Sequence, residues 1–229
     1  MAKVKFTAVV ADMRNKLNGS VFSRNRGGAY VRTKVTPLNP QTSAQVGARS
    51  LLTSLAQSFR SLTQEQITAW NNATSQWAGT DVFGDVVNPT GLALYVRLNA
   101  NISNGGGTSI STPPSPVGAS ALETLTLSAA VTGSEFDVAF VPSTVPANHT
   151  MYVESTQMLS PGISNANSRF RFIATVAAAA ASPADLYAAQ TSKFGALVAG
   201  QKVFVRAKFI NKITGELSLA LKASDIVAA

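Results

Sequence analysis

The chain has 229 residues, of which 45% are hydrophobic, enough to build at least one buried core. It contains no cysteine, so a disulfide framework and a thiolate metal site are excluded. Charged residues make up only 13%, against about 25% in ordinary soluble domains. A surface so poor in charge is typical of a subunit that its neighbours cover, and a secreted domain with a neutral surface is the alternative.

The net charge of +8 is concentrated at the N-terminus. Residues 1–35, which we call the arm, hold eight bases and one acid, Asp12, which gives 8 − 1 = +7. Concentrated positive charge predicts a negative partner, either nucleic acid or the acidic surface of a neighbouring protein. We interpret all eight bases as partner-binding residues: Lys3, Lys5, Arg14, Lys16, Arg24, Arg26, Arg32 and Lys34.

The arm has the residue pattern of β-strands. Its first segment alternates with a period of two, which places Val4, Phe6, Ala8 and Val10 on one face. Two further strand-like runs, 21–24 and 29–35, flank a Gly27-Gly28 pair. Such a pair predicts a hairpin turn, because both central positions of a type I′ turn need a positive φ.

A Gly27-Gly28 loop would fix which residues pair across this hairpin. Arg26 would face Ala29 and Arg24 would face Val31. Arg24 and Arg26 would then project from one face of the hairpin, and Arg32 and Lys34 from the other. Since neither face could be buried deeply, we expect the arm to lie against a partner.

Residues 36–41 predict an extended link, because its two prolines disfavour helix. Capping-box patterns at Thr42 and Thr63 predict two helices that pack together as a helical hairpin. Both tryptophans, Trp70 and Trp77, are interpreted as core residues of this hairpin. The link and the first helix carry a connector motif, in which Asn39 and Pro40 fix the exit from the arm, Thr42 and Gln45 start the helix, and Arg49 reaches back to carbonyls of the arm.

The rest of the chain divides at a stretch rich in glycine and proline. Residues 79–104 are irregular apart from one short helix predicted over 92–101, and 105–118 are typical of a linker. The predicted organisation is therefore a basic β-hairpin arm and link (1–41), a helical hairpin and irregular connector (42–104), a linker (105–118) and a last domain (119–229).

The last domain has the pattern of a β-sandwich. Short alternating strands are predicted over 122–130, 135–141, 151–156, 168–176, 202–210 and 216–222, with a hairpin loop at 211–215 and a short helix starting near residue 183. Strands of this length and spacing favour an immunoglobulin or fibronectin type of sandwich. The fold class expected for the whole chain is α+β, mainly β.

The chain offers few residues for catalysis or for binding a cofactor. Its one histidine, His149, lies in a predicted turn and is interpreted as solvated. No two of the 11 acids are spaced to share a face, and Asp81 and Asp85 bracket a short turn that could at most hold a cation weakly. Phosphate-loop and nucleophile-elbow motifs are absent. We expect no enzymatic activity, no cofactor and no metal.

No apolar stretch reaches the length of about 18 residues that suggests a transmembrane helix. The N-terminus also lacks the apolar run of a signal peptide. We therefore expect no membrane partner.

One series of motifs indicates a protein family more specifically than the composition does. Its elements, in chain order, are Gly19-Ser20-Val21-Phe22, Gly28-Ala29-Tyr30-Val31-Arg32, Pro37 to Gln45, Arg49, Leu62-Thr63, Ala69-Trp70, Thr90-Gly91, Leu94-Tyr95, Leu98-Asn99 and Pro113-Pro114. The series resembles a family of tailed-bacteriophage and prophage virion proteins over about residues 19–116. The resemblance implies a particle component with a C-terminal immunoglobulin-like module, and it assigns no catalytic residue.

The function expected from the sequence is therefore assembly. The leading hypothesis is a multi-copy structural protein of a tailed-phage virion. A capsid-associated auxiliary or decoration protein is the first choice of position, and a neck or tail component is the alternative. Its partners would be other virion proteins, and the arm could also contact packaged DNA without sequence preference. A packaged nucleic-acid-binding protein and a cell-surface adhesion module are the alternatives from other classes.

Overall fold

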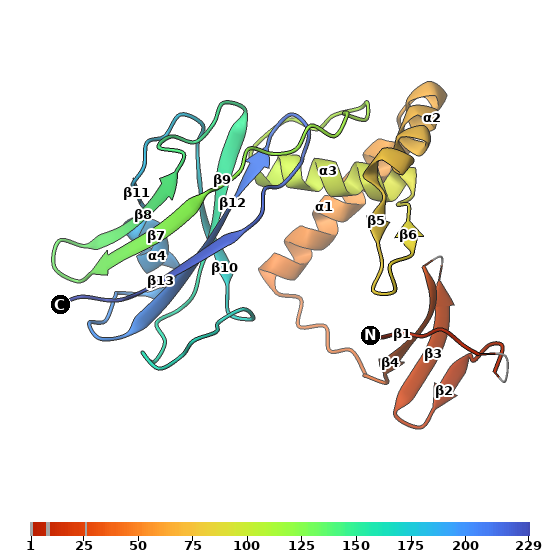
Figure 1. The fold of residues 1–229 in the computed structure, drawn as a ribbon, viewed down its shortest axis with the longest axis horizontal. Helices are drawn as coiled ribbons and strands as arrows, with labels where there is room; N and C mark the ends of the chain where they lie inside the picture. The colour runs from red at the N-terminus through yellow and green to blue at the C-terminus, as the bar shows by residue number, and fades with distance from the viewer. Residues whose placement is uncertain (1, 8–9, 26) are drawn as a thin grey trace.

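The computed structural model describes residues 2–7, 10–25 and 27–229. The protein is a mixed α+β protein with more residues in strands than in helices. A small N-terminal sheet, a group of three helices and a two-sheet body follow one another along the chain (Figure 1). In Figure 1 the helices lie beside the two-sheet body, and the N-terminal sheet lies below the helices and apart from that body.

The arm forms a four-stranded antiparallel sheet in the order β1-β4-β3-β2. Its strands are β1 (Ala2–Lys3), β2 (Asn15–Leu17), β3 (Ser20–Asn25) and β4 (Gly28–Thr33). The long first strand predicted from the alternation ends at Lys3, and its Ala8 lies outside the described residues. The arm is therefore more than a hairpin, although β3 and β4 are its longest strands.

The predicted hairpin register was wrong, because the pair next to the loop was placed one residue too late on both strands. Arg24 pairs with Ala29 and Asn25 with Gly28, so the loop begins one position earlier than the Gly-Gly pair suggested. The Asn25 side chain accepts the Gly27 amide in this turn, an interaction that the glycine pattern did not reveal. Arg24 and Arg32 nevertheless lie on opposite faces, as predicted; Arg26 is outside the described residues.

The helical part is built around α3 (Gly91–Asn104), a longer helix than predicted. The two capped helices, α1 (Ser43–Arg60) and α2 (Gln64–Ala73), begin where the Thr42 and Thr63 patterns placed them. A 3-10 turn, η1 (Thr74–Trp77), leads to a short hairpin of β5 (Gly79–Thr80) and β6 (Val86–Val87). The predicted α1–α2 hairpin is not the main contact, because both helices pack chiefly against α3.

Aromatic side chains fill the space around α3. Trp70 is completely buried, and its ring packs edge-on against Tyr95 with centroids 5.2 Å apart. Phe59 of α1 contacts the other side of Tyr95 at 5.3 Å. Trp77 is partly buried, with the Arg97 guanidinium 5.4 Å from its ring centre. Both tryptophans therefore belong to the core or its margin.

Residues 105–118 are not a free linker. Asn99, fully buried on α3, accepts the Ile110 amide at 2.7 Å and donates to the Ile110 carbonyl. The Trp70 indole donates to the Ser111 carbonyl at 2.8 Å. Buried polar groups are hydrogen-bonded in native proteins, and here the partners that they need are backbone groups of this segment. The segment is therefore tied to the helices, which glycine and proline content alone could not indicate.

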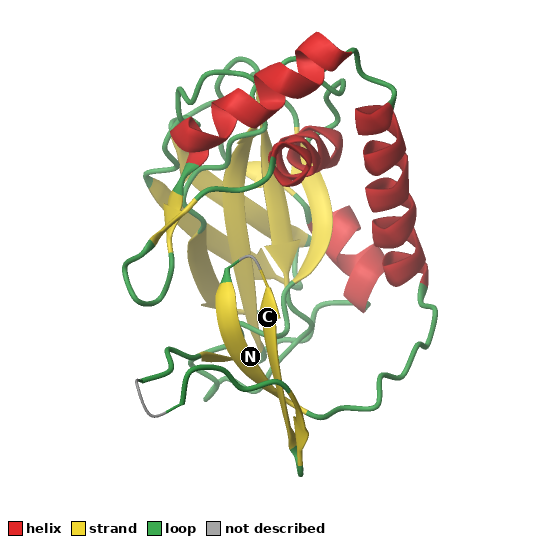
Figure 2. Ribbon diagram, turned by 90° about the vertical axis from the view of Figure 1, so that its right-hand side faces the viewer, coloured by secondary structure: helices red, strands yellow, loops and turns green. Residues whose placement is uncertain are grey.

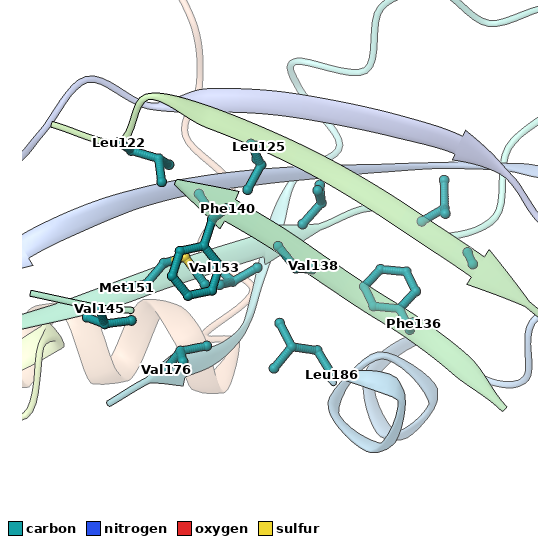
Figure 3. Packing of buried hydrophobic residues seen from close by; sticks show 14 of the residues in the cluster. Leu122, Leu125, Phe136, Val138, Phe140, Val145, Met151, Val153, Val176 and Leu186 are labelled. Carbon is teal, nitrogen blue, oxygen red and sulfur yellow. The ribbon is translucent and has the colours of Figure 1, made fainter. Parts of the chain in front are cut away.

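The C-terminal half consists of two antiparallel sheets, one with the strand order β10-β9-β12-β13 and one with the order β11-β8-β7. The elements are β7 (Thr124–Ala130), β8 (Glu135–Val141), β9 (His149–Ser155), β10 (Arg171–Val176), β11 (Ala184–Asp185), α4 (Tyr187–Phe194), β12 (Lys202–Asn211) and β13 (Leu221–Ile226). Alternate residues of β8, Phe136, Val138 and Phe140, are buried in the core of this half. Figure 3 shows Phe140 close to Met151 and Val153 of β9, with Phe136 further along β8.

Most of the predicted strands are present, and three local predictions were wrong. The helix predicted to start near residue 183 begins at Tyr187, because Ala184–Asp185 pair with β8 as a strand. The turn at 211–215 forms, but after a single bridge between Ile210 and Leu217 the regular ladder of β13 begins at Leu221, five residues later than predicted. His149, predicted to be solvated, is only 7% exposed at the start of β9. Its Nε2 accepts the Ser120 amide and its Nδ1 lies 2.8 Å from the Ala147 carbonyl.

Candidate interaction surfaces

None of the described residues between positions 2 and 35 is buried. A sheet without a hydrophobic face against a core has little stability of its own. The arm is held instead by polar contacts with the β5–β6 hairpin, whose turn lies beside it (Figure 1). We call residues 79–87 the docking hairpin.

Two of the predicted arm bases bind acids of the docking hairpin. The Lys3 Nζ lies 2.6 Å from the Asp81 Oδ2, and the Lys5 Nζ lies 2.9 Å from the Asp85 Oδ2. The Lys5 ammonium also sits 4.9 Å from the centre of the Phe83 ring, in cation–π range. Asp81 and Asp85, considered above as a weak cation site, thus receive two lysine ammonium groups from the same chain.

Asp81 combines this ion pair with a structural role in its own turn. Its Oδ1 accepts the amides of Phe83 at 2.8 Å and Asp85 at 3.0 Å, while its Oδ2 accepts Lys3. The hydrogen bond from Lys3 is the main cause that lowers the pKa of Asp81 from 3.8 to about 2, and the two amides add to it against an opposing effect of burial. Only 10% of this side chain is exposed, so the carboxylate is well enclosed.

The second pair is much more open to solvent. The side chains of Lys5 and Asp85 are 60% and 58% exposed. Pairs of this kind contribute about 0–1 kcal/mol and weaken with salt. Docking of the arm therefore depends mainly on Lys3 and Asp81, with Lys5 adding a small contribution.

The other predicted arm bases contact neither the helices nor the two-sheet body through a salt bridge between described residues. Arg14 pairs within the arm, with Asp12 at 2.8 Å. Four bases remain exposed on the surface of the arm, and they are Lys16, Arg24, Arg32 and Lys34. Because Arg24 and Arg32 lie on opposite faces of the sheet, this positive charge surrounds the arm and does not form one flat basic surface.

The structure brings the connector motif together largely as predicted. Thr42 Oγ1 accepts the Gln45 amide at 3.4 Å and so caps α1. Arg49 does reach back, but its Nη2 donates to the Asn39 side-chain oxygen at 2.7 Å and not to a carbonyl of the arm. Pro40 lies between these residues on an exposed link. The motif thus fixes the direction in which the chain enters α1.

An apolar groove lies between α1 and α3, and the sequence did not predict it. It has a volume of about 590 Å³ and is lined by Leu51, Leu52 and Leu55 of α1, Val96 and Ala100 of α3, and Phe172 of β10. Leu52 is 54% exposed, and Phe172 is 42% exposed. A contiguous exposed apolar surface on a soluble protein is typical of an interaction site. The clue in the sequence is that α1 carries more apolar residues than one buried stripe requires.

Three carboxylates gather on the outer face of the three-stranded sheet. Asp137 of β8 is the cross-strand partner of Asp185 in β11, and Glu135 lies two residues before Asp137. Burial raises the pKa of Asp137, and the charges of Asp185 and Glu135 raise it further. The expectation that no two acids share a face was wrong. Glu135 and Asp137 are two residues apart on β8, so the strand period already places them on one face. The pairing of Asp137 with Asp185 joins residues 48 positions apart, which no local pattern indicates.

The described residues contain no group of three or more His, Asp and Glu side chains arranged to hold a metal ion. No helix among them combines the length and the apolar character needed to cross a bilayer. No protein-family profile matches the chain, and comparison with curated proteins and with solved structures finds no match either. The case for a function therefore rests on the surfaces described above.

Proposed function

We propose that the protein is a non-enzymatic, multi-copy structural component of a tailed-phage virion, in first place a capsid-associated auxiliary or decoration protein. The observation that carries this proposal is an arm without one buried described residue, attached to the body by two ion pairs. The contacts within such a segment contribute little to its stability. We therefore infer that contacts with a neighbouring subunit provide the remaining stabilisation. The resemblance of the motif series in residues 19–116 to virion proteins is the reason for placing this assembly in a tailed-phage particle.

The apolar groove supports the same proposal. A subunit that assembles with others needs an exposed apolar surface, and the groove between α1 and α3 provides one. Figure 2 shows the link running into the end of α1, the helix that forms one side of this groove. The first eight residues of α1, 43–50, are all exposed and extend this surface. The arm, the link and the groove would thus lie on one continuous assembly surface.

The strand order supports an immunoglobulin-type assignment for the C-terminal half, as part of this proposal. In chain order, β7, β8 and β11 correspond to strands A, B and E, while β9, β10, β12 and β13 correspond to C, C′, F and G. In the immunoglobulin plan, A, B and E share one sheet and G, F, C and C′ share the other. Such a module would serve as an outward-facing or second contact domain.

The proposal is tested by locating the protein in purified particles of the phage or prophage that encodes it. We expect it to co-purify with the particles in many copies. Separation of heads from tails before mass spectrometry then distinguishes a capsid-associated protein from a neck or tail component. Absence from washed particles, with the protein abundant in the lysate, would contradict a virion role.

The exposed arm bases favour one second candidate, a packaged nucleic-acid-binding protein. If Lys16, Arg24, Arg32 and Lys34 each neutralised one phosphate, the logarithm of the duplex affinity would fall with the logarithm of salt with a slope of roughly −3.6. Nanomolar duplex binding with a slope of this size would favour the DNA-binding candidate. Weak binding without that slope would favour a protein partner for the arm.

A further inference from the structure

The docking hairpin binds an arm that is joined to α1, and so to the rest of the body, through an exposed link. We propose that the docking hairpin takes the arm of a second copy of this chain, so that neighbouring copies exchange arms through the Lys3–Asp81 and Lys5–Asp85 pairs. This inference rests on the multi-copy assembly of the proposed function and names the partner. It can be tested on purified protein without a particle.

The fit of a second copy follows from contacts that the structure already contains. The arm presents Lys3 and Lys5, and the docking hairpin presents Asp81, Phe83 and Asp85 at matching positions. An arm from another copy carries the same lysines in the same N-terminal segment and can make the same contacts. Exchange of an identical element between copies is a low-cost route to oligomers, since no new surface has to be created.

The link, together with the last two residues of the arm, has the length and exposure that exchange requires. Eight residues, 34–41, separate the end of β4 from the cap of α1, and all of them are exposed. When extended, this segment spans at most about 26–29 Å. The Arg49–Asn39 hydrogen bond fixes only its last part, next to α1. The part before Asn39 can therefore direct the arm to its own hairpin or to that of an adjacent copy.

The balance between the two arrangements depends on concentration. Closed and exchanged copies contain the same arm–hairpin contacts, so their free energies differ mainly in the link and in the entropy of association. The pairs that hold the closed arm include one that is largely exposed, and none of the arm residues that the structure describes is buried, so none has to be removed from a core to open it. Crowding of copies in an assembly then favours exchange.

Single-cysteine variants can report where the arm is docked, because the natural chain has no cysteine. Ala2→Cys places a thiol next to Lys3 in β1, and Thr80→Cys places one next to Asp81 in β5; both positions are exposed. The double variant, treated with a short bis-maleimide at low protein concentration, shows that the two positions are within reach in one chain. A concentrated mixture of the two single variants can form a mixed dimer only when an arm of one copy reaches the hairpin of another.

The proposal expects a cross-linked heterodimer in this mixture, with a yield that rises with concentration and is lost in high salt. Adding Lys3→Glu and Lys5→Glu to the Ala2→Cys copy should abolish the heterodimer. The matched control, Lys16→Glu with Lys34→Glu, changes the net charge equally at exposed residues and should leave it in place.

Cross-linking within the double variant, combined with no heterodimer at any concentration, would show that the arm stays on its own chain and would overturn the proposal. A heterodimer that survives the Lys3 and Lys5 reversal would overturn it equally, since its contact would not be the one proposed. Neither of these results bears on whether the protein is incorporated into particles, which the analysis of purified particles tests separately. Circular dichroism of each variant confirms that the body remains folded.

Discussion

Asp81 joins two parts of the chain through one carboxyl group. One oxygen closes the turn of the docking hairpin by accepting two backbone amides, and the other accepts the ammonium of Lys3. A carboxylate with this many donors is favoured strongly in its charged form. Its titration therefore reports directly whether the arm is docked.

We predict that replacing Lys3 raises the pKa of Asp81 from about 2 toward its ordinary value of 3.8, because the hydrogen bond from Lys3 is the largest cause of the lowered value. For a carboxyl with a lowered pKa in the folded state, the stabilisation is complete above the unfolded value and is lost as the pH falls. Docking of the arm should thus be constant above about pH 4 and weaken toward pH 2. The measurement is a carbon-13 NMR titration of the Asp81 carboxyl in the natural protein and in Lys3→Ala.

Lys5→Ala is the control for this titration. Lys5 pairs with Asp85, so its removal should leave the titration midpoint of Asp81 where it is in the natural protein. An Asp81 midpoint that does not move in Lys3→Ala would mean that the two side chains are not paired in solution.

Gly215 is the second residue on which the arrangement of the parts depends. Its φ is +75°, and a Cβ at this position would overlap the backbone carbonyl of Leu98 in α3. Asn101, one turn further along α3, donates its side-chain amide to the Gly215 carbonyl at 2.8 Å. The turn between β12 and β13 thus lies directly against α3, and only glycine allows this close approach.

Gly215→Ala should therefore lower the free energy of unfolding by more than the roughly 1–2 kcal/mol that a left-handed conformation costs an alanine. Gly200→Ala is the matched control, because Gly200 has a similar φ of +77° with no atom within 4 Å of an added Cβ. Chemical denaturation of both variants measures the difference. Equal losses for the two substitutions would indicate that the contact with α3 is not rigid.

At the scale of elements, α2 shows what a local pattern can predict. Thr63 and Gln66 form both hydrogen bonds of the capping box, at 3.3 and 3.0 Å. Thr63→Ala should lower stability by about 1 kcal/mol, because an amide of the first turn loses its acceptor. Thr68→Ala, in the middle of the same helix, should be neutral or slightly stabilising, since alanine is the better helix former. Thermal unfolding of the two variants makes the comparison, and equal melting temperatures would place the start of α2 elsewhere.

The elements that the sequence predicted well depend on neighbours in the chain. Caps at Thr42 and Thr63 and the alternation of β8 involve residues a few positions apart, and the structure confirms them. The wrong predictions involve distant partners. The length of β1, the start of β13 and the docking of residues 105–118 are decided by pairing and burial that no local pattern carries.

The same distinction applies to the candidate surfaces. The charge of the arm could be read from the sequence, but its pairing with the docking hairpin joins residues 78 positions apart. One usable signal was present, since Asp81 and Asp85 are two of the three acids in residues 36–115 and have the sign opposite to the arm. The apolar groove depends on how α1 lies across α3, which helical periodicity does not determine.

At the scale of the whole molecule, hydrogen bonds and close backbone contacts join the helices to the two-sheet body. Thr150 of β9 donates to the Gly105 carbonyl at 3.0 Å, and the Gly215 turn contacts α3. These contacts and the docked segment 105–118 join the two parts over several elements. The arm is the exception, because it is attached through side-chain charges and an exposed link.

Deletion of residues 1–35 should therefore separate folding from assembly. None of the described residues in that range is buried, so the remaining chain should unfold at nearly the same temperature as the full protein. Incorporation into particles should be lost, since the arm is the proposed contact with neighbouring subunits. Thermal unfolding measures the first effect, and the amount of protein in purified particles measures the second. A truncated chain that enters particles at the full copy number would show that the groove or the sandwich is the anchor and that the arm is dispensable.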